Sequence, residues 1–166
     1  LFEHLNRSGL RAIAGPVLMD THCPDELRLP VAPAMANLEE LAELWHNRNG
    51  KLQVAAIPRF ALSCSMEMMQ AAGQLARDYG LWTSTHLSEN ILECEEAKRM
   101  FGTNDYLEVY EAAGLVHSKS VFAHCIHLSE AEIERMAAAQ SIVAHCPDSN
   151  DFLGSGHMPT QRLKDA

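Results

Sequence analysis

Residues 82–94, WTSTHLSENILEC, place a histidine and a carboxylate where a short apolar run turns polar. His86 comes at the end of the run, and Glu89 follows three residues later. Neutral imidazole is a favoured ligand of zinc and similar ions, and a catalytic zinc lowers the pKa of a bound water to about 7. A carboxylate beside that water can carry its proton. The spacing therefore predicts His86 as a metal ligand and Glu89 as a proton shuttle.

Other reactive side chains also stand where apolar runs end. Arg59 and Phe60 end a second run, His124 ends a third, and His145 with Pro147 ends a fourth. Taken singly, each has an ordinary explanation as a surface charge, a core aromatic or a hydrogen-bonded histidine. Because the carboxyl ends of parallel strands meet in one mouth, their coincidence favours a common site. The remaining histidines are interpreted as structural or surface residues: His4, His22, His46, His117, His127 and His157.

The elements that must position these residues alternate along the chain. Short apolar runs predict strands over 11–20, 51–60, 81–87, 120–125 and 141–146. Amphipathic stretches predict helices over 37–50, with Asn37 as N-cap and Gly50 as stop, over 65–80, across 90–114, and after a capping box from Ser129 to Glu132. Parallel strands need crossovers long enough to hold a helix, so we expect one α/β domain of consecutive βα units. The proline-containing loop 20–36 is expected to face the substrate.

Composition excludes several classes of protein. The 166 residues carry 13 Lys and Arg against 22 Asp and Glu, a formal charge of -9, without a basic cluster that would bind nucleic acid. The five cysteines form no C-x-x-C pair, which favours reduced thiols in a cytoplasmic protein. No apolar run approaches the roughly 18 residues of a membrane helix, and the N-terminus lacks the layout of a signal peptide. We therefore expect neither a nucleic-acid nor a membrane partner.

Four phrases resemble the guanine deaminases of the amidohydrolase superfamily, in the same order along the chain: PRFALSCS (58–65), THLSEN (85–90), VFAHCIHLS (121–129) and AHCPDSNDFLGSG (144–156). The resemblance implies a metal-dependent (β/α)8 barrel that hydrolyses the exocyclic amine of guanine to give xanthine and ammonia. It implies zinc as the metal, with iron as an alternative. It also implies a small-molecule substrate and a homo-oligomer.

The same resemblance implies a role for each site residue. His86 matches the metal ligand on the fifth strand of the family, and Glu89 matches its proton-shuttling carboxylate. His124 matches the sixth-strand histidine that stabilises the attacking hydroxide. Arg59 and Phe60 match residues that hold the purine, the first through its carbonyl oxygen and the second by ring contact.

The sequence also departs from the family pattern. It contains no H-x-H pair, which supplies two first-strand ligands in the family, and no counterpart of the last-strand aspartate. Asp148 and Asp151 stand where the family has neutral residues. The predicted strands correspond to the third to seventh of a barrel of eight. We therefore expect residues 1–166 to be part of a barrel domain without its first, second and last strands. Alone, they should be inactive and associate through the edges at 11–19 and 141–146.

Two other interpretations stay open. One is a superfamily member that acts on a different heterocycle, such as a triazine, an oxidised guanine or an adenosine derivative, since the H-x-x-E and H-x-P-x-S-N patterns are shared. The other is a non-catalytic scaffold or interaction protein built on a partial barrel. Metal content and the substrate that is deaminated would separate the three.

Overall fold

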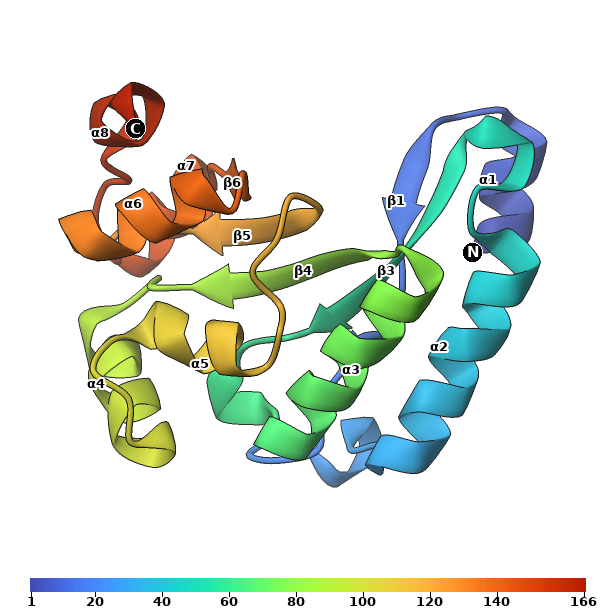
Figure 1. Cartoon of the computed structure of the whole chain (residues 1–166), viewed down its shortest axis with the longest axis horizontal. Coiled ribbons are helices and arrows are strands. Elements are labelled where there is room, and N and C mark those ends of the chain that lie inside the picture. The colour runs from blue at the N-terminus through green and yellow to red at the C-terminus, as the bar shows by residue number, and fades with distance from the viewer.

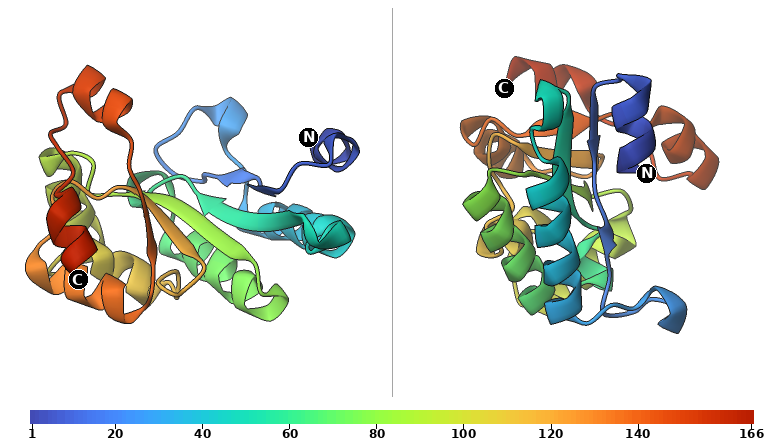
Figure 2. Two further views of the ribbon diagram at one scale, coloured as in Figure 1. Left: turned by 90° about the horizontal axis from the view of Figure 1, so that it is seen from above. Right: turned by 90° about the vertical axis from the view of Figure 1, so that its right-hand side faces the viewer.

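The computed structural model describes residues 1–166, whose strands form one parallel sheet (Figure 1). The sheet has six strands in the order β1-β3-β4-β5-β6, and β2 also pairs with β3. The strands are β1 (Ala12–Ala14), β2 (Val17–Leu18), β3 (Leu52–Pro58), β4 (Trp82–Leu87), β5 (Ser120–His124) and β6 (Ile142–Ala144). Figure 2 shows the sheet curled rather than flat. The predicted α/β fold, a partial (β/α)8 barrel, is confirmed.

Helices connect successive strands and cover one face of the sheet. In the left view of Figure 2 the helices α2, α3, α5 and α6 lie along this face, and the two termini lie at opposite ends of the sheet. The helices are α1 (Phe2–Ser8), α2 (Val31–Trp45), α3 (Met66–Tyr79), α4 (Ile91–Phe101), α5 (Tyr106–Ala112), α6 (Glu130–Ala138), α7 (Pro147–Leu153) and α8 (Thr160–Asp165), with 3-10 turns η1 (Asp25–Leu27), η2 (Arg48–Gly50) and η3 (Ala61–Ser63). None of the helices combines the length and apolarity needed to cross a membrane.

Burial along the strands shows which side chains face the helices. Five of the seven β3 residues are buried, and β3 has neighbours on both sides, β1 and β2 on one and β4 on the other. In β4 burial alternates, with Thr83, Thr85 and Leu87 buried and His86 only half-buried. Thr85 contacts Tyr110 of α5, so the buried set faces the helices. His86 therefore lies on the opposite, concave face of the curled sheet.

The first predicted strand, 11–20, is divided into β1 and β2. Between them, Gly15 approaches β3 so closely that a Cβ would lie 1.7 Å from the carbonyl oxygen of Ala55. Pro16 follows and cannot donate to the ladder. Both halves remain parallel to β3 and pair with it at different heights. The break therefore changes the local path but not the topology.

The predicted helix boundaries at 37 and 50 are wrong. Helix α2 begins at Val31, after Pro30, and includes Asn37 in its interior. A proline in the first turn removes no intrahelical hydrogen bond, so Pro33 does not prevent this earlier start. The helix ends at Trp45 because His46 is extended. The loop expected over 20–36 is correspondingly shorter. The helices predicted at 65–80 and across 90–114, and the capping box of α6, are confirmed.

Candidate active site at the carboxyl ends of β4 and β5

His86 is held by the backbone of the neighbouring strand. Its Nδ1 lies 2.7 Å from the carbonyl oxygen of Arg59, and its backbone N–H donates to the same oxygen at 3.2 Å. Because a carbonyl oxygen only accepts, Nδ1 carries the proton and Nε2 keeps its lone pair. Burial lowers the pKa of His86, which favours the neutral ring. This is the state and orientation that a metal-ligating histidine requires.

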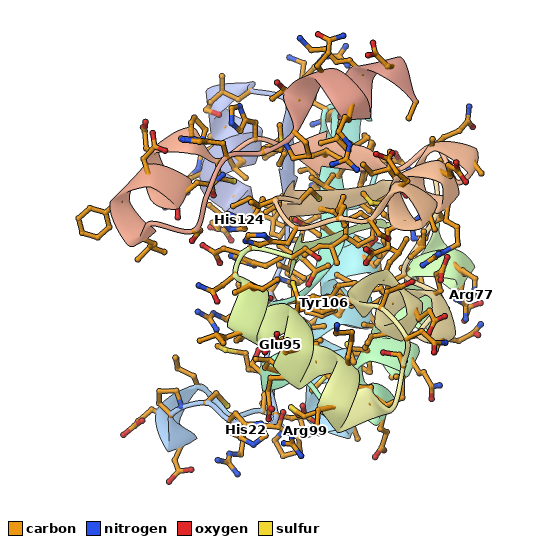
Figure 3. The ribbon with its side chains drawn as sticks, turned by 90° about the vertical axis from the view of Figure 1, so that its left-hand side faces the viewer. His22, Arg77, Glu95, Arg99, Tyr106 and His124 are labelled. Atoms are coloured by element: carbon orange, nitrogen blue, oxygen red, sulfur yellow. The ribbon has the colours of Figure 1, made fainter.

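His124, labelled in Figure 3, ends β5 and stacks against His86. The two ring centroids lie 5.1 Å apart, with 28° between the planes. The Nδ1 of His124 lies 2.8 Å from Oδ1 of Asn150, a buried residue of α7, and its Nε2 lies 3.5 Å from Oε2 of Glu89. The predicted residues His86, Glu89 and His124 therefore come together. Asn150 joins them and was not predicted, although it lies in the phrase HCPDSN.

The backbone around these residues is strained. Ser88, His124 and Cys125 have φ angles of 52°, 74° and 52°, in the left-handed region that non-glycine residues rarely adopt. Such conformations cost on the order of 1–3 kcal/mol each and concentrate at functional sites. Here the strain interrupts the regular alternation of side chains at the two strand ends that carry His86 and His124.

Arg59 and Phe60 lie next to His86 on the loop that follows β3. The Arg59 guanidinium lies over the Phe60 ring, 4.6 Å from its centroid. Phe60 in turn presents an edge-to-face contact to His86, with 6.5 Å between centroids. Arg59 is exposed and forms no ion pair, so its donors are free for a ligand. A planar aromatic molecule with a carbonyl oxygen would match this arrangement.

The residues that follow β6 contribute less to this cluster. His145 is exposed and makes no side-chain hydrogen bond, and Asp148 is likewise exposed. Asp151 lies 3.5 Å from His157, both exposed. No group of three or more His, Cys, Asp or Glu side chains that could hold a metal ion is present. His86 and His124 each have one ring nitrogen held by an oxygen, of Arg59 and Asn150 respectively, but two histidines do not complete a metal site.

Comparison with known proteins identifies close relatives. The chain is 42% identical over 158 residues to guanine deaminase from Escherichia coli, which covers 94% of this chain and 36% of the relative. The crystal structure of guanine deaminase from C. acetobutylicum with bound guanine superposes with a TM-score of 0.95 at 36% identity, covering 99% of this chain and 40% of that one. A zinc-bound adenosine deaminase from Xanthomonas campestris gives 0.89 at 25% identity, with coverages of 99% and 36%.

Two further findings define what these similarities mean. The chain spans only about a third of the length of the curated relatives it matches. The sequence profile described as the amidohydrolase family matches residues 1–166, the whole chain. The chain belongs to the amidohydrolase family.

Proposed function

We propose that this chain is part of an enzyme that hydrolyses guanine to xanthine and ammonia. The observation that carries the proposal is the joint position of Glu89, His124 and His86, with Glu89 Oε2 3.5 Å from His124 Nε2 and the two histidine rings stacked. The similarity to guanine deaminases supports this substrate over an adenosine derivative or a triazine. Identity is 42% to the guanine deaminase from Escherichia coli, 30% to two 5-methylthioadenosine/S-adenosylhomocysteine deaminases, and 25% or less to the adenosine deaminase and the atrazine chlorohydrolase.

Glu89 would move the protons of the reaction. Water adds to the ring carbon that bears the amine, and the carboxylate of Glu89 takes one of its protons and delivers it to the adjacent ring nitrogen. A second proton transfer to the amine allows the C–N bond to break, with its electron pair leaving on ammonia. The side chain of Glu89 is 19% exposed, so it can reach a bound ligand, and His124 lies beside it at 5%. His124 would stabilise the developing negative charge.

Arg59 and Phe60 would select the purine. The Arg59 guanidinium can donate to the carbonyl oxygen of guanine, whereas adenine offers an amine at the same position and would leave the donors unpaired. Phe60 provides an aromatic ring next to His86, where a flat base can pack. Both residues already lie on the loop that contacts His86.

A metal ion, zinc or alternatively iron, is the proposed cofactor. When bound, such an ion lowers the pKa of a water and makes it a nucleophile. The Nδ1–H of His86 donates to a backbone carbonyl and its pKa is lowered by burial, which supports His86 as one ligand. The remaining ligands would have to come from outside the residues described. A zinc-bound relative is consistent with this proposal.

We further propose that residues 1–166 are part of a (β/α)8 barrel and supply its third to seventh βα units. The parallel strands, and the match to about a third of the length of the relatives, support a partial barrel. We also propose that the protein is a cytoplasmic homo-oligomer. Its substrate is a small molecule, and it binds neither nucleic acid nor a membrane.

Ammonia release tests the proposal directly. The full-length protein, meaning the whole polypeptide that its gene encodes, should release ammonia from guanine and not from adenine or an aminotriazine. Residues 1–166 expressed alone should release none, because they hold no group of three metal-binding side chains. Preference of the full-length protein for another heterocycle would favour the second substrate class. Absence of both metal and activity from the full-length protein would favour a non-catalytic partial barrel.

A further inference from the structure

The hydroxyl of Tyr110 lies at the junction of the two segments that carry the candidate site. Tyr110 belongs to α5 and is fully buried. Its hydroxyl donates to the carbonyl oxygen of His86 at 2.7 Å and accepts the backbone N–H of Ala61 at 3.0 Å. The Thr85 hydroxyl lies 3.1 Å away and is the third partner, and the Tyr106 hydroxyl lies further away, at 3.3 Å. A tyrosine hydroxyl has one donor and two acceptor positions, so all three are used.

These hydrogen bonds determine where the Arg59–Phe60 loop lies. At Arg59 the backbone N–H donates to Leu18 and the carbonyl accepts from His86. At Ala61, immediately after Phe60, the N–H is bound by Tyr110. The intervening Phe60 is extended, with φ -167° and ψ 166°. The proposed purine-binding pair is therefore held at both ends, and Tyr110 is the side chain that holds the second end.

We propose that Tyr110 is a positioning residue for purine recognition: its hydroxyl sets the distance between the Arg59–Phe60 loop and the His86 strand. The proposal rests on the proposed function, because the ligand of this loop is taken to be guanine. Tyr110 would not touch the substrate. It would act through the backbone N–H of Ala61 and the carbonyl oxygen of His86. Removal of the hydroxyl takes away the hydrogen bond that each of these buried groups makes to Tyr110.

Tyr106 provides a matched control one helical turn earlier. It is equally buried, stacks on Tyr110 with 5.4 Å between ring centroids, and lies between α4 and the sheet (Figure 3). Its hydroxyl donates to Glu93 at 2.7 Å and lies 3.3 Å from the Tyr110 hydroxyl, but it contacts neither Ala61 nor His86. Tyr106→Phe and Tyr110→Phe therefore remove the same atom from the same core. They differ in whether that atom binds the backbone of the site.

The experiment measures guanine kinetics and unfolding midpoints of the full-length protein. Tyr110→Phe should raise KM about tenfold, the size of one lost buried hydrogen bond, with a smaller change in kcat. Tyr106→Phe should lower the unfolding midpoint comparably and leave KM unchanged. In an Arg59→Ala background the effect of Tyr110→Phe on KM should largely disappear, because the two residues serve one contact. Equal KM values for the two phenylalanine variants, or full additivity with Arg59→Ala, would overturn the proposal.

Two further measurements test the proposal if Tyr110→Phe does not fold or if the protein does not deaminate guanine. If Tyr110→Phe does not fold, Thr85→Val should raise KM in the same direction by a smaller factor, and an unchanged KM would then reject the proposal. If the wild-type protein does not deaminate guanine, the proposed function fails by itself. Amide hydrogen exchange over residues 59–64 then decides: faster exchange in Tyr110→Phe than in Tyr106→Phe supports the positioning role, and equal exchange rejects it.

Discussion

The carboxyl and amino ends of β4 and β5 differ in how their polar groups are used. At the carboxyl ends, Ser88, His124 and Cys125 adopt left-handed backbone conformations that cost free energy in non-glycine residues. The Ser88 hydroxyl and the side-chain nitrogen of Asn150 are buried without a hydrogen-bond partner. The strained backbone and the unpaired buried groups therefore both lie at the end of the strands that carries His86 and Glu89.

At the amino ends the corresponding groups are satisfied. The left-handed residues before β4 and β5 are the glycines Gly80 and Gly114, which adopt this conformation readily. Lys119 donates to the carbonyl of Gly80 at 2.6 Å, and the Ser120 hydroxyl donates to Leu115 at 2.6 Å. The two strands thus have a strained backbone at their carboxyl ends, whereas the polar groups at their amino ends are hydrogen-bonded. We infer that substitutions at the carboxyl end change activity and that those at the amino end change stability.

The largest expected effect is that of Glu89→Gln in the full-length protein. The amide keeps the shape of the side chain and cannot transfer a proton, so kcat for guanine should fall by about 10²–10⁴-fold, the usual contribution of general acid–base catalysis. Metal content and guanine binding should be retained. Glu95→Gln, on the exposed face of α4, is the control and should leave turnover unchanged. A Glu89→Gln variant with near-normal kcat would remove Glu89 from the mechanism.

Substitution of Arg59 should have the next largest effect. Arg59→Ala should raise KM for guanine by roughly tenfold to a hundredfold, the size of a lost charge-assisted hydrogen bond. Arg59→Lys should not restore it, because an ammonium group does not reproduce the planar fork. Arg48 also lies over an aromatic ring, 4.8 Å from the centroid of Trp45, but outside the candidate site. Arg48→Ala is therefore the control. Equal kinetics for the wild type and Arg59→Lys would identify Arg59 as a surface charge.

The order and parallel pairing of the strands could be predicted because apolar runs and amphipathic helices alternate with few interruptions. The position of His86 at the end of its run also followed from the sequence. The division of the first strand did not, because it depends on the contact between Gly15 and Ala55, which are 40 residues apart. A pattern of neighbouring residues does not show which distant residues come into close contact.

The same limit applies to the candidate site. His86 and Glu89 are neighbours in sequence, whereas the bond between His124 and Asn150 and the contacts of Tyr110 join elements that are 24 to 49 residues apart. Tyr110 lies in an ordinary amphipathic helix, and no local signal separates it from a core aromatic. The tertiary structure alone shows that its hydroxyl faces the backbone of the site.

A smaller effect, confined to stability, is expected at the amino end for Ser120→Ala. The Ser120 hydroxyl is buried, accepts from the backbone of His117 and from Thr83 at 3.0 Å each, and donates to Leu115. Its loss leaves buried groups unpaired and should lower the free energy of unfolding by about 1–3 kcal/mol. Turnover per folded molecule should be unchanged. Ser141→Ala, which removes a single bond of 3.3 Å to His117, is the milder control. If the Ser120→Ala protein were stable but inactive, this would contradict the inference that the amino ends of the strands affect stability and not activity.

The smallest expected effect is the pH dependence contributed by His46, also on the amino side. Its Nδ1 accepts the backbone N–H of Val54 at 3.1 Å, a bond that only the unprotonated nitrogen can make. Burial and then the charge of Lys119 lower the pKa of His46 below its ordinary 6.5. The unfolded chain therefore takes up the proton first on acidification. The contribution of His46 to stability is present above pH 6.5 and is lost as the pH falls through the lower pKa that His46 has in the folded chain.

Urea unfolding of the full-length protein from pH 8 to about pH 5 should show a shallower loss of stability in His46→Gln than in the wild type. His4→Gln, at an exposed position of α1, should leave the slope unchanged. An identical slope in His46→Gln would mean that His46 titrates alike in the folded and unfolded chains.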